Sequence, residues 1–96
     1  MINFIKKLFG INTVDFKELM KNGAQIIDVR TITEFNNGHL RNSINIPLQD
    51  LKSKLDEINK QKPVITVCAS GMRSASAKGI LAKNGFEVYN LSLIHI

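Results

Sequence analysis

The residues best suited to chemistry lie in one short run, Cys-Ala-Ser-Gly-Met-Arg-Ser at 68–74, which holds the only cysteine of the chain. The run follows the apolar, β-branched stretch Val64–Val67 and leads into residues 74–81, whose apolar positions recur at helical spacing. This pattern predicts a strand, a tight loop and a helix. Loop N–H groups and the helix dipole favour negative charge at that point, so we expect Cys68 to be a thiolate, the nucleophilic form.

A lone cysteine is usually a buried structural residue rather than a nucleophile. Here the neighbours on the C-terminal side are small or polar, and Arg73 follows five residues after Cys68. These neighbours argue against burial. We therefore predict that Cys68 is a catalytic residue.

The 96 residues suffice for one small domain, and the hydrophobic content of 44% is typical of a globular protein. One cysteine excludes an internal disulfide, and no paired Cys/His spacing indicates zinc. We expect no metal and no cofactor, and a reducing, cytoplasmic location. The net charge of +5 is spread along the chain, and one Tyr with no Trp disfavours nucleic-acid binding. A modestly positive surface suits a small anionic substrate.

Both ends of the chain differ from its middle. Residues 1–12 are predicted to form an amphipathic segment, too short and too interrupted by lysines to span a membrane. Residues 1–11 could lie on a membrane surface, dock on a partner or pack on their own domain. The last six residues, 91–96, contain no cap, turn or closing element. The DNA string CTGTCTCTTATACACATC, which resembles a transposase mosaic end, encodes them. We expect a non-native tail and a C-terminally truncated domain, which resequencing of the locus would test.

Between these ends, short helical and strand patterns alternate. Helices are predicted at residues 14–22, 31–36, 48–60 and after the cysteine loop, and strands at 25–29, 43–46, 64–67 and 86–89. Such alternation predicts an α/β domain with a small parallel β-sheet flanked by helices. Functional groups of these sheets gather at the carboxyl ends of strands, where Cys68 lies.

Four runs in this order give a more specific interpretation. They are Asp28-Val29-Arg30 with Glu34-Phe35 and Gly38-His39, then Ser43 to Leu48, then Cys68 to Ser74, then Gly85 to Tyr89. Together they resemble the rhodanese-like sulfurtransferase family in its small single-domain form. The resemblance covers roughly residues 14–90, so we expect a rhodanese-like domain at 13–90. The sequence departs from the family at Ile32, where many relatives have proline, and lacks the Gly-Gly turn expected after Asn90.

The resemblance implies that Cys68 takes a sulfane sulfur from a donor such as thiosulfate, forming a persulfide, and passes it to cyanide or a thiol. We expect the backbone N–H groups of Ala69, Ser70, Gly71, Met72 and Arg73 to surround the sulfur and bind the substrate. Gly71 permits a tight bend. Arg73 has three open roles: stabilising the thiolate, holding an anionic donor, or bracing the loop. Ser74 is a candidate helix cap, and Met72 shapes the entrance.

Other residues of these motifs are expected to be structural. In the family Arg30 and Glu34 look like an ion pair, Asp28 anchors a loop, and His39 hydrogen-bonds the backbone. A cysteine phosphatase has five residues between its Cys and Arg, whereas four separate Cys68 from Arg73. That shorter loop suits a single sulfur atom better than a tetrahedral oxyanion.

Two other functions stay open at this point. The domain could be a non-catalytic binding module, or a persulfide carrier whose acceptor is a partner protein. Residues 1–11 are the one feature that indicates docking on such a partner. Deleting them separates the alternatives, since a carrier would lose partner capture and keep small-molecule turnover. The sequence does not identify the physiological donor or acceptor.

Overall fold

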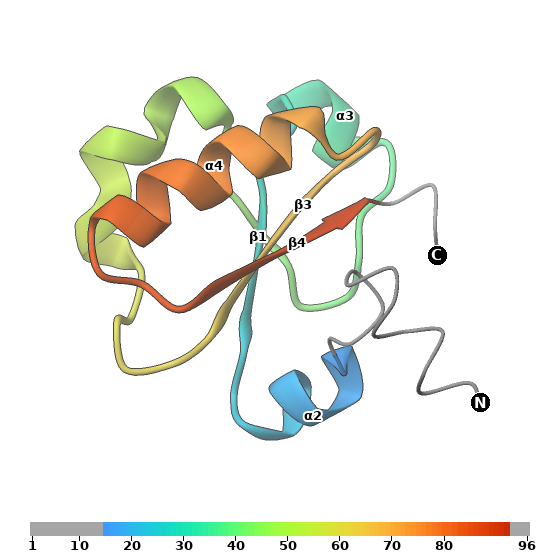
Figure 1. The fold of residues 1–96 in the computed structure, drawn as a ribbon. Helices are drawn as coiled ribbons and strands as arrows, with labels where there is room; N and C mark the ends of the chain where they lie inside the picture. Colours follow the sequence, from blue (N-terminus) through green and yellow to red (C-terminus); the bar gives the residue numbers. More distant parts are fainter. Residues whose placement is uncertain (1–14, 93–96) are drawn as a thin grey trace.

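The computed structural model describes residues 15–92, in which helices and strands alternate (Figure 1). In order, the elements are α2 (Phe16–Lys21), β1 (Gln25–Asp28), α3 (Ile32–Asn36), β2 (Ile44–Asn45), η2 (Leu48–Glu57), β3 (Val64–Cys68), α4 (Met72–Lys83) and β4 (Val88–Ser92). The helix considered for residues 1–11 lies outside the described residues. Within residues 15–92 no helix combines the length and the apolar character needed to cross a membrane.

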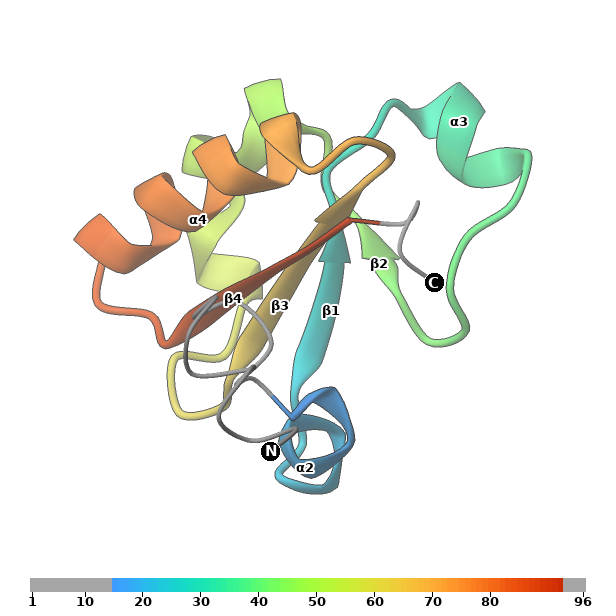
Figure 2. The same cartoon turned by 45° about the vertical axis from the view of Figure 1, so that its right-hand side comes forward.

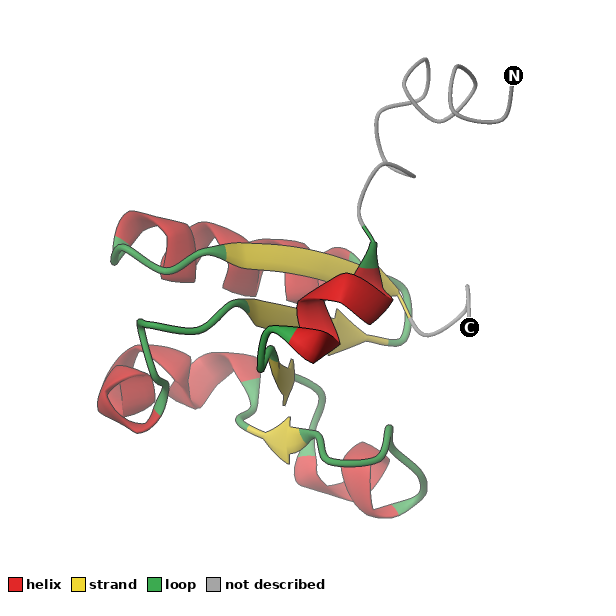
Figure 3. Ribbon diagram, turned by 90° about the horizontal axis from the view of Figure 1, so that it is seen from below, coloured by secondary structure: helices red, strands yellow, loops and turns green. Residues whose placement is uncertain are grey.

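The four strands of residues 15–92 form one parallel sheet in the order β2-β1-β3-β4, drawn yellow in Figure 3. In the centre of the sheet, Thr66 of β3 lies opposite Ile27 of β1 and Asn90 of β4. The prediction of a small parallel sheet flanked by helices is confirmed. Because all strands run the same way, their carboxyl ends share one edge, and Cys68 ends β3 at that edge.

Helices cover both faces of the sheet (Figure 2). Successive side chains of a strand point to opposite faces, and β3 therefore contributes to two clusters. Val64 and Cys68 pack with residues of α4 and η2, while Ile65 and Val67 pack with residues of α2. Burial of all five β3 residues explains why this strand reads as a continuous β-branched run. The alternation assigns the Cys68 side chain to the α4 face.

Local hydrogen bonds fix the ends of the short helices. Asp15 caps α2 by accepting from the Glu18 N–H at 3.2 Å, and Gly23 follows with a φ of 84°. α3 begins with a capping box: Thr31 Oγ1 accepts from the Glu34 N–H at 3.2 Å, and Glu34 Oε1 accepts from the Thr31 N–H at 2.9 Å. The capping box holds the Glu34 carboxylate at the carboxyl edge of the sheet.

The helix predicted for residues 48–60 has the expected apolar face and a different geometry. Leu51 and Ile58 are buried in the larger core cluster, and Leu48 and Leu55 are partly buried against it. The element is a 3-10 helix over Leu48–Glu57 that is interrupted at Lys54, where φ is −119° and ψ is 18°. Periodicity predicted which side chains are buried, because it reports the face of an element more reliably than its hydrogen-bond pattern.

The last strand begins and ends later than predicted. Phe86 precedes β4 and is buried in the larger cluster, with the Lys60 ammonium 5.5 Å from its ring centre. β4 runs through Leu91, whose side chain packs against the smaller cluster. The boundary proposed after residue 90 therefore falls within this strand. The non-native origin of residues 91–96 stays a prediction, and residues 93–96 lie outside the described residues.

Candidate active site

The turn from β3 to α4 forms the candidate site, as the sequence predicts. Cys68 is the last residue of β3, and Met72 is the first residue of α4. Gly71, between them, caps the helix with φ 92° and ψ −9°, in the left-handed region that residues with a Cβ avoid. This conformation turns the chain tightly enough to bring the first turn of α4 back over the sulfur.

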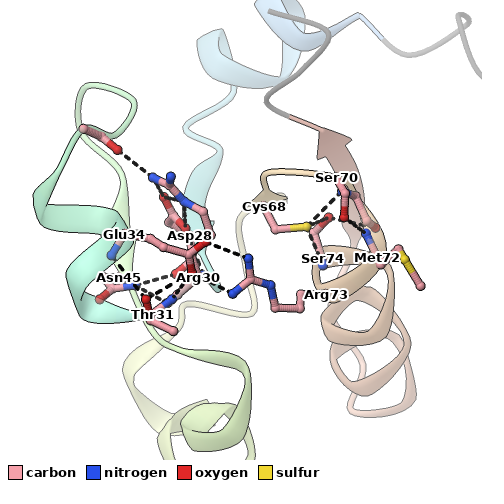
Figure 4. Close-up of polar contacts among 12 residues, drawn as sticks. Asp28, Arg30, Thr31, Glu34, Asn45, Cys68, Ser70, Met72, Arg73 and Ser74 are labelled. Atoms are coloured by element: carbon pink, nitrogen blue, oxygen red, sulfur yellow. Dashed lines mark hydrogen bonds and ion pairs between the residues drawn. The ribbon is translucent and has the colours of Figure 1, made fainter.

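Backbone N–H groups of this turn point at the Cys68 sulfur (Figure 4). The Gly71 N–H donates to Sγ at 3.0 Å and the Ser74 N–H donates at 3.3 Å. Burial by itself raises the pKa of the Cys68 thiol. Hydrogen bonds from the Ser74 side chain and from the backbone of Ser74, Gly71 and Arg73 outweigh it and lower that pKa below its ordinary value. The turn therefore makes the Cys68 thiol more acidic than an ordinary cysteine, as expected for the start of a helix.

The prediction that Cys68 escapes burial is wrong. The residue is 0% exposed and belongs to the larger core cluster. Small polar neighbours indicate a surface loop, but the strand alternation directs this side chain under the first turn of α4. The sulfur thus combines burial with a hydrogen-bonded environment, an arrangement that neighbouring residue types do not reveal.

Arg73 turns away from the sulfur and pairs with Glu34 of α3 (Figure 4). Nη1 lies 2.8 Å from Oε1 and Nη2 lies 3.0 Å from Oε2, which is a two-pronged ion pair. The hydrogen bonds from Arg73, followed by the one from the Thr31 backbone, lower the pKa of Glu34 to about 2. Of the three roles considered for Arg73, this geometry matches the brace, which links the cysteine turn to α3.

The predicted ion pair between Arg30 and Glu34 is wrong. Arg30 pairs with Asp28, with Nη2 2.8 Å from Oδ2, and Arg30 Nη2 also donates to the Gly38 carbonyl at 2.7 Å. Asp28 is 0% exposed, and its Oδ1 also accepts from the Arg30 N–H at 3.0 Å. A buried carboxylate needs a close cation, and Arg30 is two residues away in the chain. The expected loop-anchoring role of Asp28 is confirmed by these contacts.

Ser74 does not cap α4, contrary to one of our predictions. The cap is Gly71, and Ser74 lies buried in the first turn with its hydroxyl next to sulfur. The Cys68 thiol is within 3.4 Å of Ser74 Oγ, which also contacts Asn90 Oδ1 of β4. Buried Thr66 donates to the Ser74 carbonyl at 2.9 Å. Sequence spacing missed Asn90, because no local signal places β4 beside this turn.

Ala69, Ser70 and Met72 complete the turn, and His39 lies outside it. Ala69 and Ser70 form the bend after β3, and Ser70 Oγ accepts from the Met72 N–H at 3.4 Å. The Met72 side chain is 77% exposed, which leaves it free to shape an entrance. His39 lies in the loop between α3 and β2, where Nδ1 is 2.7 Å from the Phe35 carbonyl oxygen, as predicted for a structural role.

A family model described as the rhodanese-like domain matches residues 12–93 of the chain. The chain belongs to the rhodanese-like family. This rhodanese-like domain is 48% identical over 69 residues to the uncharacterized protein YqhL of Bacillus subtilis, covering 71% of the chain and 55% of YqhL. It is 34% identical over 69 residues to the thiosulfate sulfurtransferase GlpE of Shewanella oneidensis, covering 71% of the chain and 68% of GlpE. The chain thus spans 55% of the length of YqhL and 68% of the length of GlpE.

Solved structures give the same family fold. The rhodanese-related protein of Thermoplasma volcanium superposes with a TM-score of 0.73 at 33% identity, covering 81% of this chain and 77% of that one. A structure of a rhodanese with anions from E. coli superposes with a TM-score of 0.67 at 32% identity, covering 72% and 85%. The rhodanese-like domain described here therefore keeps the α/β architecture of relatives that include thiosulfate sulfurtransferases.

Proposed function

We propose that this rhodanese-like domain is a sulfurtransferase that moves a sulfane sulfur through a persulfide on Cys68. The observation that carries the proposal is the position of Sγ at the start of α4, with the N–H groups of Gly71 and Ser74 at 3.0 and 3.3 Å. These fixed dipoles stabilise a negative sulfur and need no reorganisation during reaction. The lowered pKa of Cys68 increases the share of the thiolate, the nucleophilic form.

The proposed reaction has two balanced steps. In the first, the Cys68 thiolate attacks the outer sulfur of thiosulfate, the S–S bond of the donor breaks, and sulfite leaves with the bonding electron pair. In the second, a nucleophile such as cyanide attacks the outer sulfur of the persulfide. Thiocyanate forms, and the electron pair of the broken S–S bond returns to Cys68 as thiolate. The N–H groups of the turn stabilise the anionic sulfur in both resting forms.

The polar turn also supplies a place for the substrate. We propose that the loop from Ala69 to Arg73, through Ser70, Gly71 and Met72, forms the wall against which the donor binds. Arg73 contributes by bracing the turn through Glu34, since both prongs of its guanidinium are engaged there. The net charge of +5 favours the approach of a small anion.

The test is the intact mass of reduced protein after exposure to thiosulfate, with Cys68→Ala as control. We expect a gain of one sulfur atom that the control lacks and that cyanide removes. Cys68 is the only cysteine, so no second thiol can account for the adduct. A folded protein that gains no sulfur from thiosulfate or from a polysulfide would refute sulfur transfer and favour a binding module.

A further inference from the structure

The Ser74 hydroxyl lies between the Cys68 thiol, which can donate a hydrogen bond to it, and the Asn90 amide oxygen, which accepts one from it. On one side the Cys68 sulfur is 3.4 Å from Ser74 Oγ. On the other side the hydroxyl faces two acceptors, Asn90 Oδ1 from β4 and the Gly71 carbonyl oxygen at 3.2 Å. Asn90 reaches this place because its neighbours Tyr89 and Leu91 pack on the opposite face of the sheet.

The orientation of the Asn90 amide follows from its second contact. Asn90 Nδ2 lies 3.3 Å from the Gly71 carbonyl oxygen, which can only accept a hydrogen bond. The amide nitrogen must face that carbonyl, since turning the amide over would set two acceptors against each other. Oδ1 therefore faces Ser74 Oγ and accepts from the hydroxyl, which has the Gly71 carbonyl oxygen at 3.2 Å as a second acceptor. With its hydrogen committed to Asn90, Ser74 Oγ presents lone pairs to Cys68 and accepts from the thiol.

A hydroxyl has one hydrogen, so this arrangement fits only one charge state of the sulfur. A protonated Cys68 donates to Ser74 Oγ, and Ser74 donates to Asn90. A thiolate can only accept, and the lone pairs of a hydroxyl still bound to Asn90 would repel it. The hydroxyl must rotate from Asn90 to the sulfur to stabilise the negative charge. The N–H groups of Gly71 and Ser74 donate to the sulfur in both states.

We propose that Asn90 is a positioning residue for Cys68: it holds the Ser74 hydroxyl toward itself, favours the protonated thiol, and competes with the ionised sulfur for that hydrogen bond. The inference rests on the proposed role of Cys68 as nucleophile. It adds a residue from β4, outside the cysteine loop, that sets how much thiolate is present at a given pH. Asn90 is exposed, so the amide oxygen can bind water when the hydroxyl leaves.

The test measures the pKa of Cys68 from the ultraviolet absorbance of its thiolate across a pH series, with Cys68→Ala as the baseline. The variants are Asn90→Ala and Asn90→Leu, the second being close in size to asparagine and lacking an acceptor. We expect the pKa to fall by about half to one unit, the equivalent of one ordinary hydrogen bond, which is about three- to tenfold more thiolate below the pKa. Removing the Asn90 amide does not leave the Gly71 carbonyl without a donor, because this carbonyl still accepts from the Ala75 N–H at 3.0 Å.

A second background separates this role from a general structural one. In Ser74→Ala, where no hydroxyl is left to redirect, Asn90→Leu is expected to leave the pKa of Cys68 unchanged. Asn90→Asp, a stronger acceptor, is expected to raise the pKa by more with Ser74 present than without it. Equal shifts in both backgrounds, or a raised or unchanged pKa in Asn90→Leu, would overturn the proposal. Thermal unfolding checks that each variant is folded, and because no donor is added, the outcome is independent of the thiosulfate test.

Discussion

At Cys68, burial and hydrogen bonding act on one sulfur atom in opposite directions. A thiol that is 0% exposed would ordinarily have a raised pKa, yet the surrounding donors lower it. Gly71 makes this possible, because its left-handed backbone brings its own N–H to 3.0 Å from the sulfur. The reactivity expected of the site thus depends on the backbone conformation of one residue.

Replacing Gly71 by alanine tests that dependence. At a φ of 92° a Cβ is strained, and we expect Gly71→Ala to destabilise the fold by about 1–2 kcal/mol and to raise the pKa of Cys68. The matched control is Gly79→Ala in the same helix, where the added Cβ meets no other part of residues 15–92 within 4 Å apart from the helix's own backbone. This control should stabilise the fold by about 1 kcal/mol, since alanine is the better helix former. Urea unfolding measures the change in the free energy of unfolding for both variants. Equal changes in the two variants would contradict the role given to Gly71.

Some features of the site lie within one continuous run of the sequence, and others join separate segments. The positions of Cys68 and Gly71 between a strand and a helix were predicted, because both lie in one continuous run whose flanking patterns indicate these elements. The pairing of Arg73 with Glu34 and the contact of Asn90 with Ser74 were not, since each joins segments far apart in the chain. Such contacts depend on sheet order and register, which local patterns do not specify.

At the scale of elements, the Arg73–Glu34 pair links α4 to α3 across the carboxyl edge of the sheet. The capping box of α3 holds Glu34 through Thr31, and the same carboxylate pairs with Arg73, so it serves both the helix start and the brace. The two side chains are 38% and 37% exposed, and solvent screens their attraction. Their main effect is therefore expected on the geometry of the turn, with a smaller effect on overall stability.

Acid titration tests the brace. The pKa of Glu34 is about 2 in the folded chain, below its ordinary value of 4.5. A lowered pKa means that Glu34 contributes stability above pH 4.5, and that this contribution is lost as the pH falls toward 2. We expect Glu34→Gln to lose stability less steeply than the native chain over this interval, as measured by thermal unfolding. Glu57→Gln, at an exposed position in η2, is the control, and an identical acid profile for Glu34→Gln would contradict the brace.

The sequence predicted the order of the helices and strands better than their exact geometry and their first and last residues. Apolar periodicity located the buried face of residues 48–57 but not their 3-10 geometry, because periodicity does not report the hydrogen-bond pattern. The last strand was placed at residues 86–89, yet it occupies Val88–Ser92, since Phe86 fills a core position before the strand begins. Element ends depend on such tertiary contacts more than on residue type.

At the scale of the whole molecule, parallel strands bring separate parts of the chain to one edge. Asp28 ends β1 and Cys68 ends β3, while Asn90 lies in the middle of β4 and Glu34, on α3, pairs with Arg73 at the start of α4. The alternation of strands and helices predicted this convergence, because the carboxyl ends of parallel strands must meet. The family resemblance agrees with it, and the family match over residues 12–93 confirms the assignment.

Burial of the only thiol limits how fast it can react with a reagent in solution. Since Cys68 is 0% exposed, a reagent collides with its sulfur only when the β3–α4 turn opens locally. We expect iodoacetamide to label the native chain more slowly than the urea-unfolded chain, and a bulkier disulfide reagent to be slowed further. Glu34→Gln should reduce the difference in labelling rate between native and unfolded chains for both reagents. Equal labelling rates of the native and unfolded chains would contradict the need for local opening. The pace of chemistry at Cys68 is then set by how often the turn opens as well as by how much thiolate it holds.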